Sequence, residues 1–322
     1  MTELVTVGET PLRFSPPNNQ RLVSARETSL YADGMSSNVA ITAQQLGAET
    51  LWLSRLPDTP LGQRVVKQVQ EHGVETDITW TRDETNRQGL VFHESGVTPR
   101  ASQQWHDRGD VAFAYSSPSD FPMNVVQDTE ILFTDLSTAV LSKQSAETLQ
   151  ALLRASSGGG ALTAVGIDYA PELASVESYR GVFEGLSPEI DAVFANEADA
   201  RTILDQTGGA RELANLLAAE YDLDIAVVTR SERGAVALRN SPGTNIIHER
   251  GAIETDAVDP TGARAAFIGA FLEEHLREAD TARALSVAVA SAILTRTVTG
   301  PYYNATDDEL ESLVEDVINH SK

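Results

Sequence analysis

A turn followed by a helix, late in the chain, has the residue types of an anion-binding site. A β-prone stretch at 253–258 leads into the turn Asp259-Pro260-Thr261-Gly262, and Phe267 and Phe271 at i,i+4 spacing then predict a buried helix. The unpaired backbone N–H groups of residues 262–265 would point at a ligand above the helix. Together with the positive end of the helix dipole, they favour a phosphate or another anion. The segment alone leaves open a strand-to-helix turn without a ligand.

Polar residues at other predicted strand ends and helix starts could also bind a ligand. Asn38 follows Asp33-Gly34 at the start of a predicted helix, and its amide can both donate to and accept from neighbouring hydroxyls. Asp168 ends a predicted strand, and open α/β sheets bind ligands beyond such ends. The stretch from Asn196 to Asp199 begins another helix. For this stretch capping of the helix is the favoured interpretation, and capping is also open for Asn38.

The elements that must position these residues alternate regularly between strand and helix. Strands are predicted within 4–9 and at 50–55, 131–134, 162–168, 192–195 and 224–229, with helices at 143–156, 176–184, 198–205 and 210–221. A hairpin-like pair at 235–239 and 245–250 follows, and two helices at 281–295 and 306–320 come last. This alternation predicts an α/β fold, a mostly parallel sheet with helices on both faces.

The composition limits the partners of the protein. The 322 residues include 47 acidic and 24 basic side chains, a net charge of −23 that is spread along the chain and repels nucleic acid and anionic lipid. Lysine occurs only at Lys67, Lys143 and Lys322, so we expect a halophilic protein that works in molar salt, where the Debye length is about 3 Å. The absence of cysteine excludes disulfides and thiolate metal sites, and the scattered histidines do not suggest zinc.

Several classes of protein are disfavoured by the patterns that the sequence lacks. No run of 18 or more apolar residues occurs, and the first residues do not combine a basic with an apolar region. We therefore expect a cytoplasmic protein with no membrane contact. Neither GxGxxG nor GxxxxGK[ST] is present, which argues against dinucleotide binding and Walker-type phosphate binding.

The stretch from Asp259 to Phe271 resembles the C-terminal signature of the ribokinase-like (PfkB) carbohydrate kinases. In that family a DTTGAGDAFxGAF-type segment forms the phosphate anion hole and carries the catalytic Asp. The resemblance covers nearly the whole chain and implies one ribokinase-like domain at 1–322, with a β-sheet lid from segments 12–33 and 87–115. It also implies ATP, Mg²⁺, a small-molecule sugar and a homodimer formed through the lid. The 2-keto-3-deoxygluconate kinase and fructokinase branches are the most similar.

The resemblance gives roles to residues on the phosphate and sugar sides. Gly262, Ala263 and Arg264 would form the anion hole. Gly34 and Asn38 match the GGxxxNxA sugar motif, whose first Gly is Asp33 in this chain. In the sugar-acid kinases an Asp-x-Asn-x-Arg stretch lies where this chain has Asp168-Tyr169-Ala170, so Asp168 is expected to contact the substrate and the Arg is lost.

The nucleotide side is assigned in the same way. Thr229 and Gly234 match the family's TxGxxG loop, which lets backbone and hydroxyl groups approach phosphate or ribose closely, and Ser231 replaces the middle Gly. Asn196 and Asp199 resemble the NxxE motif, which acts through water on the magnesium ion and the phosphates. The helices at 281–295 and 306–320 are expected to pack over the adenine.

The largest departures from the family lie at the predicted reaction centre. Ala265 occupies the position of the base and has no proton acceptor, whereas general-base catalysis is typically worth about 10²–10⁴-fold. Arg264 replaces a Gly. It could bind the γ-phosphate, or it could fill the pocket and pair with Asp168 or Asp259, which we favour because a side chain there obstructs close approach. A substitute base role for Asp168 is also open.

The identity of the sugar is questioned by a second departure. A Tyr-Tyr-Arg stretch grips the carboxylate in the ketodeoxygluconate branch, and this chain aligns Trp105-His106-Asp107 with it, with Arg108 one residue further. An Asp cannot bind a carboxylate as a guanidinium does, which counts against a sugar acid. Two functions follow as hypotheses: an ATP-dependent carbohydrate kinase of weak or lost activity, or a pseudokinase that binds a sugar or nucleotide as a sensor or regulator.

Overall fold

The computed structural model describes residues 2–97, 99–241 and 244–320. Among these residues nine strands form one sheet, in the order β13 (Thr244–Arg250), β12 (Ala235–Ser241), β11 (Ile225–Thr229), β10 (Ala192–Asn196), β9 (Leu162–Gly166), β8 (Ile131–Asp135), β1 (Leu4–Val7), β4 (Thr50–Pro57) and β5 (Glu75–Thr81). Neighbours from β5 to β11 are parallel, and β12 and β13 add an antiparallel hairpin. The predicted alternation of strands and helices is confirmed.

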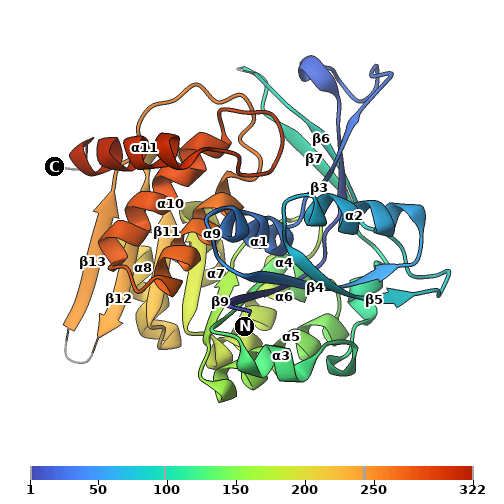
Figure 1. Ribbon diagram of the computed structural model, residues 1–322, viewed down its shortest axis with the longest axis horizontal. Coiled ribbons are helices and arrows are strands. Elements are labelled where there is room, and N and C mark those ends of the chain that lie inside the picture. The colour runs from blue at the N-terminus through green and yellow to red at the C-terminus, as the bar shows by residue number, and fades with distance from the viewer. Residues whose placement is uncertain (1, 98, 242–243, 321–322) are drawn as a thin grey trace.

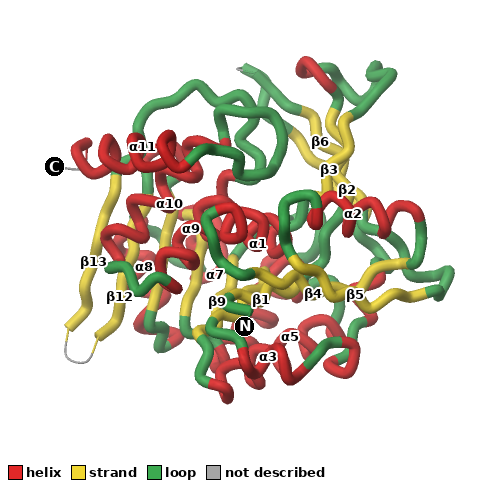
Figure 2. Tube along the Cα trace, in the orientation of Figure 1, coloured by secondary structure: helices red, strands yellow, loops and turns green. Residues whose placement is uncertain are grey.

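A smaller sheet projects from one end of the large sheet (Figures 1 and 2). Its strands in the described residues are β3 (Ser29–Ala32), β2 (Leu12–Ser15), β6 (Leu90–Glu94) and β7 (Gln103–Asp107), in that order. They come from two segments that are far apart in sequence and are joined by parallel pairing of β2 with β6. Both segments lie where the lid is expected, so the lid is a separate layer that can cover one edge of the large sheet.

Helices cover both faces of the large sheet because its central strands are apolar on both sides. One face carries α1 (Met35–Gln45), α9 (Ala263–Leu276) and α10 (Thr281–Thr295), and α11 (Asp307–His320) packs on α10. The other carries α3 (Met123–Asp128), α4 (Leu136–Ala139), α5 (Lys143–Gly159), α6 (Val176–Leu186), α7 (Glu197–Leu204) and α8 (Ala210–Tyr221). The helix α2 (Pro60–Gln70) packs beside β3, β4 and β5. In the described residues two large apolar clusters result, one on each face, and a smaller third cluster lies beside α2.

The approach to the phosphate turn is not a strand. Residues 253–258 form a loop whose end is held by the last turn of α10, because the N–H groups of Val258 and Asp259 donate to the carbonyl of Arg296 at 2.8 and 3.2 Å. The backbone therefore bonds to a helix end and has no neighbouring strand to join. No helix of the described chain is both long and apolar enough to cross a bilayer.

The carboxyl ends of five neighbouring strands carry a row of polar residues. Glu9 follows β1, Asp135 ends β8, Asp168 lies two residues beyond β9, Asn196 ends β10 and Thr229 ends β11. Because these strands are parallel and adjacent, their ends meet at one edge of the sheet. The fold thus gathers there residues that are more than two hundred positions apart in the sequence.

Candidate functional site

The turn before α9 is shaped for backbone N–H groups to meet an anion. Gly262 has φ 81°, and a Cβ at this position would lie 2.0 Å from the carbonyl oxygen of Pro301, so only glycine fits. The carboxylate of Asp259 accepts from the N–H and hydroxyl of Thr261 at 3.0 and 2.6 Å. The first helical bond runs from the Ala266 N–H to Gly262, so the N–H groups of residues 263–265 precede the helical ladder.

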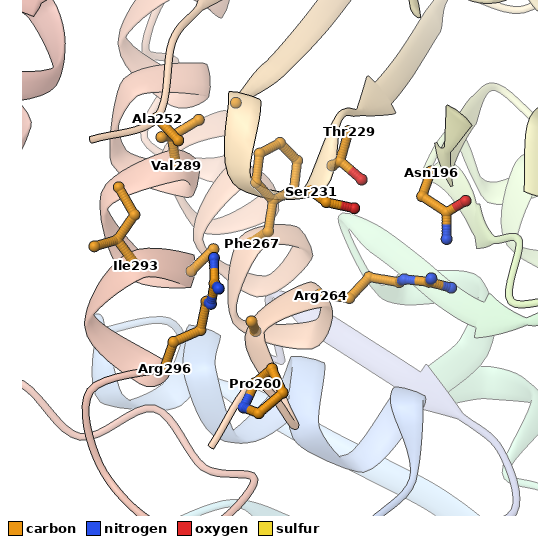
Figure 3. Close-up of a pocket in the computed structure, with 13 residues that line it drawn as sticks. Asn196, Thr229, Ser231, Ala252, Pro260, Arg264, Phe267, Val289, Ile293 and Arg296 are labelled. Atoms are coloured by element: carbon orange, nitrogen blue, oxygen red, sulfur yellow. The ribbon is translucent and has the colours of Figure 1, made fainter. Parts of the chain in front are cut away.

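A cavity of about 320 Å³ lies on one side of this turn (Figure 3), and we call it the nucleotide-side cavity. All four residues predicted for the nucleotide side line it, and so do two residues of the predicted anion hole: Asn196, Thr229, Ser231, Gly234, Ala263 and Arg264. Phe267, Val289 and Ile293 give its other wall an apolar surface, on which an adenine could pack. Of the two C-terminal helices expected here, α10 lines the cavity and α11 does not.

The loop from Thr229 to Gly234 has the tight backbone that a phosphate or ribose contact requires. Gly234 has φ 93°, and an added Cβ would lie 1.9 Å from the carbonyl oxygen of Arg250. Ser231, in place of the family's Gly, has φ 53° and accepts the left-handed conformation at a cost of about 1–2 kcal/mol. The loop keeps its glycine-type shape without the second glycine.

A second cavity of about 320 Å³ lies on the other side of the turn, beneath the lid. We call it the sugar-side cavity, because the residues predicted for the sugar line it. Gly34, Asn38, Asp168, Gly262 and Ala265 line it, and the lid strands contribute Val91, Gln104 and His106. Arg264 and Pro260 line both cavities. The residues predicted for the substrate, the base position and two positions of the anion hole, Gly262 and Arg264, therefore surround one volume, and the turn lies between it and the nucleotide-side cavity.

Asn38 presents an acceptor to this cavity. Its Nδ2 donates to Oδ1 of Asp33 at 2.8 Å, and its Oδ1 is buried without a hydrogen-bond partner in the described chain. The helix begins at Gly34 with no side-chain cap, so Asn38 is not the N-cap. A sugar hydroxyl that donates to Oδ1 would satisfy the unpaired atom.

Arg13, which the sequence did not single out, ties the lid to the phosphate turn. Its side chain on β2 is 1% exposed, and its Nε lies 3.0 Å from Asp33. Its Nη1 donates to the hydroxyl of Thr261 at 2.7 Å, and its Nη2 is 3.8 Å from Asp259. The buried guanidinium of Arg13 therefore links strand β2 of the lid to the turn before α9.

Two carboxyl groups and one arginine, those of Glu9, Asp168 and Arg108, line the sugar-side cavity, and Asp135 is linked to Asp168 through Ser137. Glu9 pairs with Arg108 at 2.8 Å, and both side chains are at most 5% exposed. Asp135 accepts from the hydroxyls of Ser36, Ser137 and Thr138 and from the N–H of Thr138. Burial, helped by the nearby Asp135, raises the pKa of both Glu9 and Asp168, although Arg108 opposes this rise for Glu9.

Arg108 occupies the position from which a ligand could be held. It lines the sugar-side cavity, its Nε is buried without a hydrogen-bond partner in the described chain, and its Nη1 is 3.5 Å from the hydroxyl of Ser137. Asp107 instead forms an ion pair with Arg87 at 2.7 Å, and both of these side chains are about half exposed. Of the two neighbours, Arg108 therefore lines the cavity and the aligned Asp107 does not.

Arg264 pairs with neither acid that the sequence suggested. Its Nη1 donates to Oδ2 of Asp199 at 2.9 Å and to the carbonyl of Ile167 at 3.2 Å. The carboxylate of Asp199 also accepts a hydrogen bond from Nδ2 of Asn196, and the N–H of Asp199 donates to Oδ1 of Asn196. Asn196 is therefore the N-cap of α7, which confirms the capping interpretation. The expected pairing with Asp168 or Asp259 is wrong because Asp199 projects from the first turn of α7 into the same wall.

The fit of a magnesium ion at Asp199 is weakened by this pair. Burial raises the pKa of Asp199, and Arg264 lowers it again. With the guanidinium 2.9 Å away, the negative charge that would attract a hydrated cation is already neutralised. In the described part of the chain no cluster of three or more His, Cys, Asp or Glu side chains could hold a metal. Magnesium would therefore arrive with the nucleotide phosphates, and the chain supplies no metal cage.

The sequence left out several residues that the structure brings into the site. Glu9, Arg13, Asp135 and Ser137 line the sugar-side cavity or contact residues that line it. Their signal was position, because Glu9 and Asp135 each lie at the carboxyl end of a predicted strand, as Asp168 does. Arg13 gave no such signal, since its partners come from segments about 20 and 250 residues away.

Comparison with known proteins places this site in a family. The family described as pfkB family carbohydrate kinase matches residues 1–308. The chain is 38% identical over 312 residues to the 2-dehydro-3-deoxygalactonokinase of Haloferax volcanii, covering 97% of this chain and 96% of that protein.

Solved structures share the fold. The 2-dehydro-3-deoxygluconokinase of Thermotoga maritima superposes with a TM-score of 0.88 at 24% identity, covering 98% of this chain and all of the other. An Escherichia coli protein solved with ATP and Mg²⁺ gives a TM-score of 0.84 at 18% identity, covering 98% and 100% of the two chains. The α/β ribokinase-like fold with its small lid sheet is confirmed, and the chain belongs to the pfkB family of carbohydrate kinases.

Proposed function

We propose that the protein binds a 2-keto-3-deoxy sugar acid and ATP and transfers the γ-phosphate to a sugar hydroxyl, slowly. The observation that carries the proposal is the wall that the two cavities share. Pro260 and Arg264 line both cavities, and the N–H groups of the first turn of α9 lie between them. A phosphoryl group leaving a nucleotide on one side would meet an acceptor on the other within reach of these donors.

The substrate class is supported by three groups in the sugar-side cavity. Oδ1 of Asn38 and Nε of Arg108 are buried without hydrogen-bond partners in the described residues, and so is Nδ1 of His106. Burial and the neighbouring Arg108 lower the pKa of His106, which keeps the imidazole neutral at pH 7. A cation and neutral polar groups suit a ligand with one carboxylate and several hydroxyls. The Haloferax relative, whose name refers to 2-dehydro-3-deoxygalactonate, supports the same class.

Phosphoryl transfer requires the protein to position the two reactants and to stabilise the developing charge, and it requires little covalent chemistry from the protein itself. Mg-ATP would supply the phosphoryl group and partly neutralise its charge. The helix N-terminus would stabilise the transferring group, and the lid would exclude water. The methyl group of Ala265 cannot accept a proton, so transfer is expected to be slower than in a kinase with Asp there, by at most the about 10²–10⁴-fold that general-base catalysis contributes.

A second candidate is binding without turnover. The Arg264–Asp199 ion pair favours it, because it occupies the wall through which the phosphoryl group must pass. In this form the protein would bind the sugar acid or the nucleotide as a sensor or as the partner of an active relative.

Calorimetry and an ADP-release assay together separate the two candidates. We would titrate the protein in about 2–3 M KCl with Mg-ATP and with 2-dehydro-3-deoxygalactonate, 2-dehydro-3-deoxygluconate, fructose and ribose. Binding of ATP and a keto-sugar acid with ADP release that depends on that acid supports the kinase. Binding of either ligand without ADP release supports the pseudokinase, and binding of neither ligand contradicts both.

A further inference from the structure

The sugar-side cavity lacks a carboxylate at the base position but contains another one on a different strand. Ala265 and Asp168 both line this cavity. Ala265 approaches it from the first turn of α9, and Asp168 approaches from the end of β9. Ile167, the neighbour of Asp168, bonds through its carbonyl to Arg264, the neighbour of Ala265, at 3.2 Å. The two positions therefore face the same cavity, and the segments that carry them are linked through the Arg264 side chain.

We propose that Asp168 is the group that accepts the proton of the acceptor hydroxyl in this chain. The assignment rests on the proposed kinase function. As the hydroxyl oxygen forms its bond to the γ-phosphorus, the bond from that phosphorus to the β,γ-bridging oxygen of ATP breaks. ADP leaves with the electron pair of the broken bond. The hydroxyl proton passes to the carboxylate of Asp168, which later releases it to solvent.

The surroundings of Asp168 hold it in place for this task. Oδ1 accepts from the N–H of Ser137 at 3.0 Å, which fixes the carboxyl group against the start of α4. The hydroxyl of Tyr179 accepts from the N–H of Ala170 at 3.3 Å and so anchors the loop after Asp168. A base must be positioned before its acidity matters, and these contacts supply the position.

The charged and titratable groups that face Asp168 come from four elements: Asp135 of β8, Arg264 of α9, Tyr179 of α6 and Arg108 beyond β7. Burial, followed by Asp135, raises the pKa of Asp168 to about 8, and Arg264 opposes the rise. A base of this pKa is effective in mildly alkaline solution and is stronger than an ordinary Asp. Turnover should therefore rise with pH through about 8.

The test compares Asp168→Asn with a rescue at position 265. Asn keeps an oxygen to accept from Ser137 and resembles the protonated acid, so the fold should be retained. We expect Asp168→Asn to lower kcat at least 100-fold and to change the dissociation constants of ATP and the keto-sugar acid by less than threefold. Adding Ala265→Asp to that variant should restore turnover and remove the rise through pH 8. Asp224→Asn, the same change at the opposite edge of the sheet, is the matched control and should behave as the wild type.

Each other result is informative. If Asp168→Asn keeps kcat within threefold of the wild type, or if the wild type binds both ligands without turnover, Asp168 is not the base. Failure of the double variant to recover, with both ligands still bound, also overturns the assignment. If the wild type binds neither ATP nor the keto-sugar acid, the proposed function itself has failed, and binding data distinguish that case from the others.

Discussion

The guanidinium of Arg264 donates to the carboxylate of Asp199 across the wall between the two cavities, at 2.9 Å. The pair joins the helix that starts at the phosphate turn to the helix that starts at the nucleotide side. It places a cation on the wall that both cavities share and cancels the charge of the Asp199 carboxylate. The net charge that this wall presents to a bound anion therefore depends on the ion pair between Arg264 and Asp199.

The first prediction concerns magnesium. In the wild type, removal of Mg²⁺ with a chelator should weaken ATP binding by less than about threefold, because Arg264 remains to meet the phosphates. In Arg264→Ala the freed Asp199 carboxylate should repel metal-free ATP, and chelation should weaken binding at least tenfold. Calorimetry with and without Mg²⁺ measures both values. Arg154→Ala, which removes an arginine from an exposed pair with Glu189, is the control. Equal magnesium dependence in all three proteins would contradict this role of Arg264.

The second prediction concerns the substrate carboxylate. Arg108→Gln should raise KM for the keto-sugar acid by about 10–150-fold, since a hydrogen bond to a charged group contributes about 1.5–3 kcal/mol. Binding of a neutral sugar should change less than threefold. Arg108→Lys keeps the positive charge but loses the planar guanidinium that can donate two parallel hydrogen bonds to a carboxylate. It should therefore keep only part of the wild-type affinity for the keto-sugar acid. A uniform loss of affinity for acidic and neutral sugars would show that Arg108 does not contact a carboxylate.

The same substitution tests the buried ion pair. Arg108→Gln leaves Glu9 buried without its partner, and the free energy of unfolding should fall by about 3–5 kcal/mol. Glu9→Gln combined with Arg108→Gln removes both charges and should regain most of that loss. Denaturant unfolding measures the free energy of unfolding of the wild type, of Arg108→Gln and of the double variant. A double variant as unstable as the single one would mean that Glu9 is not charged in the folded protein.

The sequence predicted the order of the elements because its apolar runs alternate between strand and helix periods. It also placed Asn38, Asp168 and Ala265 around a common volume, through motifs that lie at strand ends and helix starts. It failed where a residue acts through a distant partner. Arg13 meets Thr261 across 248 positions, and Arg264 meets Asp199 across 65, and no local pattern encodes either contact.

The sequence aligned Asp107 with the Arg of the ketodeoxygluconate branch, with Arg108 one residue further, and in the structure Arg108 is the one that lines the cavity. A one-residue offset in a strand moves a side chain to the opposite face of the sheet. At the end of β7 this offset separates Asp107, which pairs with Arg87 on the outside, from Arg108, which lines the cavity. The strand ends before Arg108, and only the structure shows which residue turns inward.

The third prediction concerns stability and pH. Asp168 has a folded pKa of about 8, above an unfolded value near 3.8, so the folded state binds its proton more tightly. Its contribution to stability is fully present at pH below the unfolded pKa and is lost as the pH rises to the folded pKa. The slope should be at most about 1.4 kcal/mol per pH unit between pH 4 and 8. Because Asn does not titrate and resembles the protonated acid, the unfolding free energies of the wild type and Asp168→Asn should be similar near pH 4 and diverge as the pH rises to 8, with the wild type becoming the less stable. A difference between them that does not change with pH would contradict the shifted pKa.

The fourth prediction concerns salt. We propose that the net charge of −23 destabilises the folded chain in dilute buffer through self-repulsion, which salt screens. The melting temperature should rise steeply between about 0.1 and 2 M KCl. Sucrose at equal osmolality is the control, because it lacks the screening effect. A melting temperature that is the same at both KCl concentrations would exclude adaptation of this surface to high salt.

The central claim is that the site binds its ligands but lacks the carboxylate that the family places on α9. The most direct measurement is the rate of ADP release by Arg264→Gly/Ala265→Asp, compared with the wild type, at saturating ATP and 2-dehydro-3-deoxygalactonate near pH 7. We predict an increase of at least about tenfold, because Asp168, with a pKa of about 8, is mostly protonated near pH 7, whereas a carboxylate at position 265 would be ionised and the glycine opens the passage to it. A folded double variant that binds both ligands and turns over no faster than the wild type would contradict the claim.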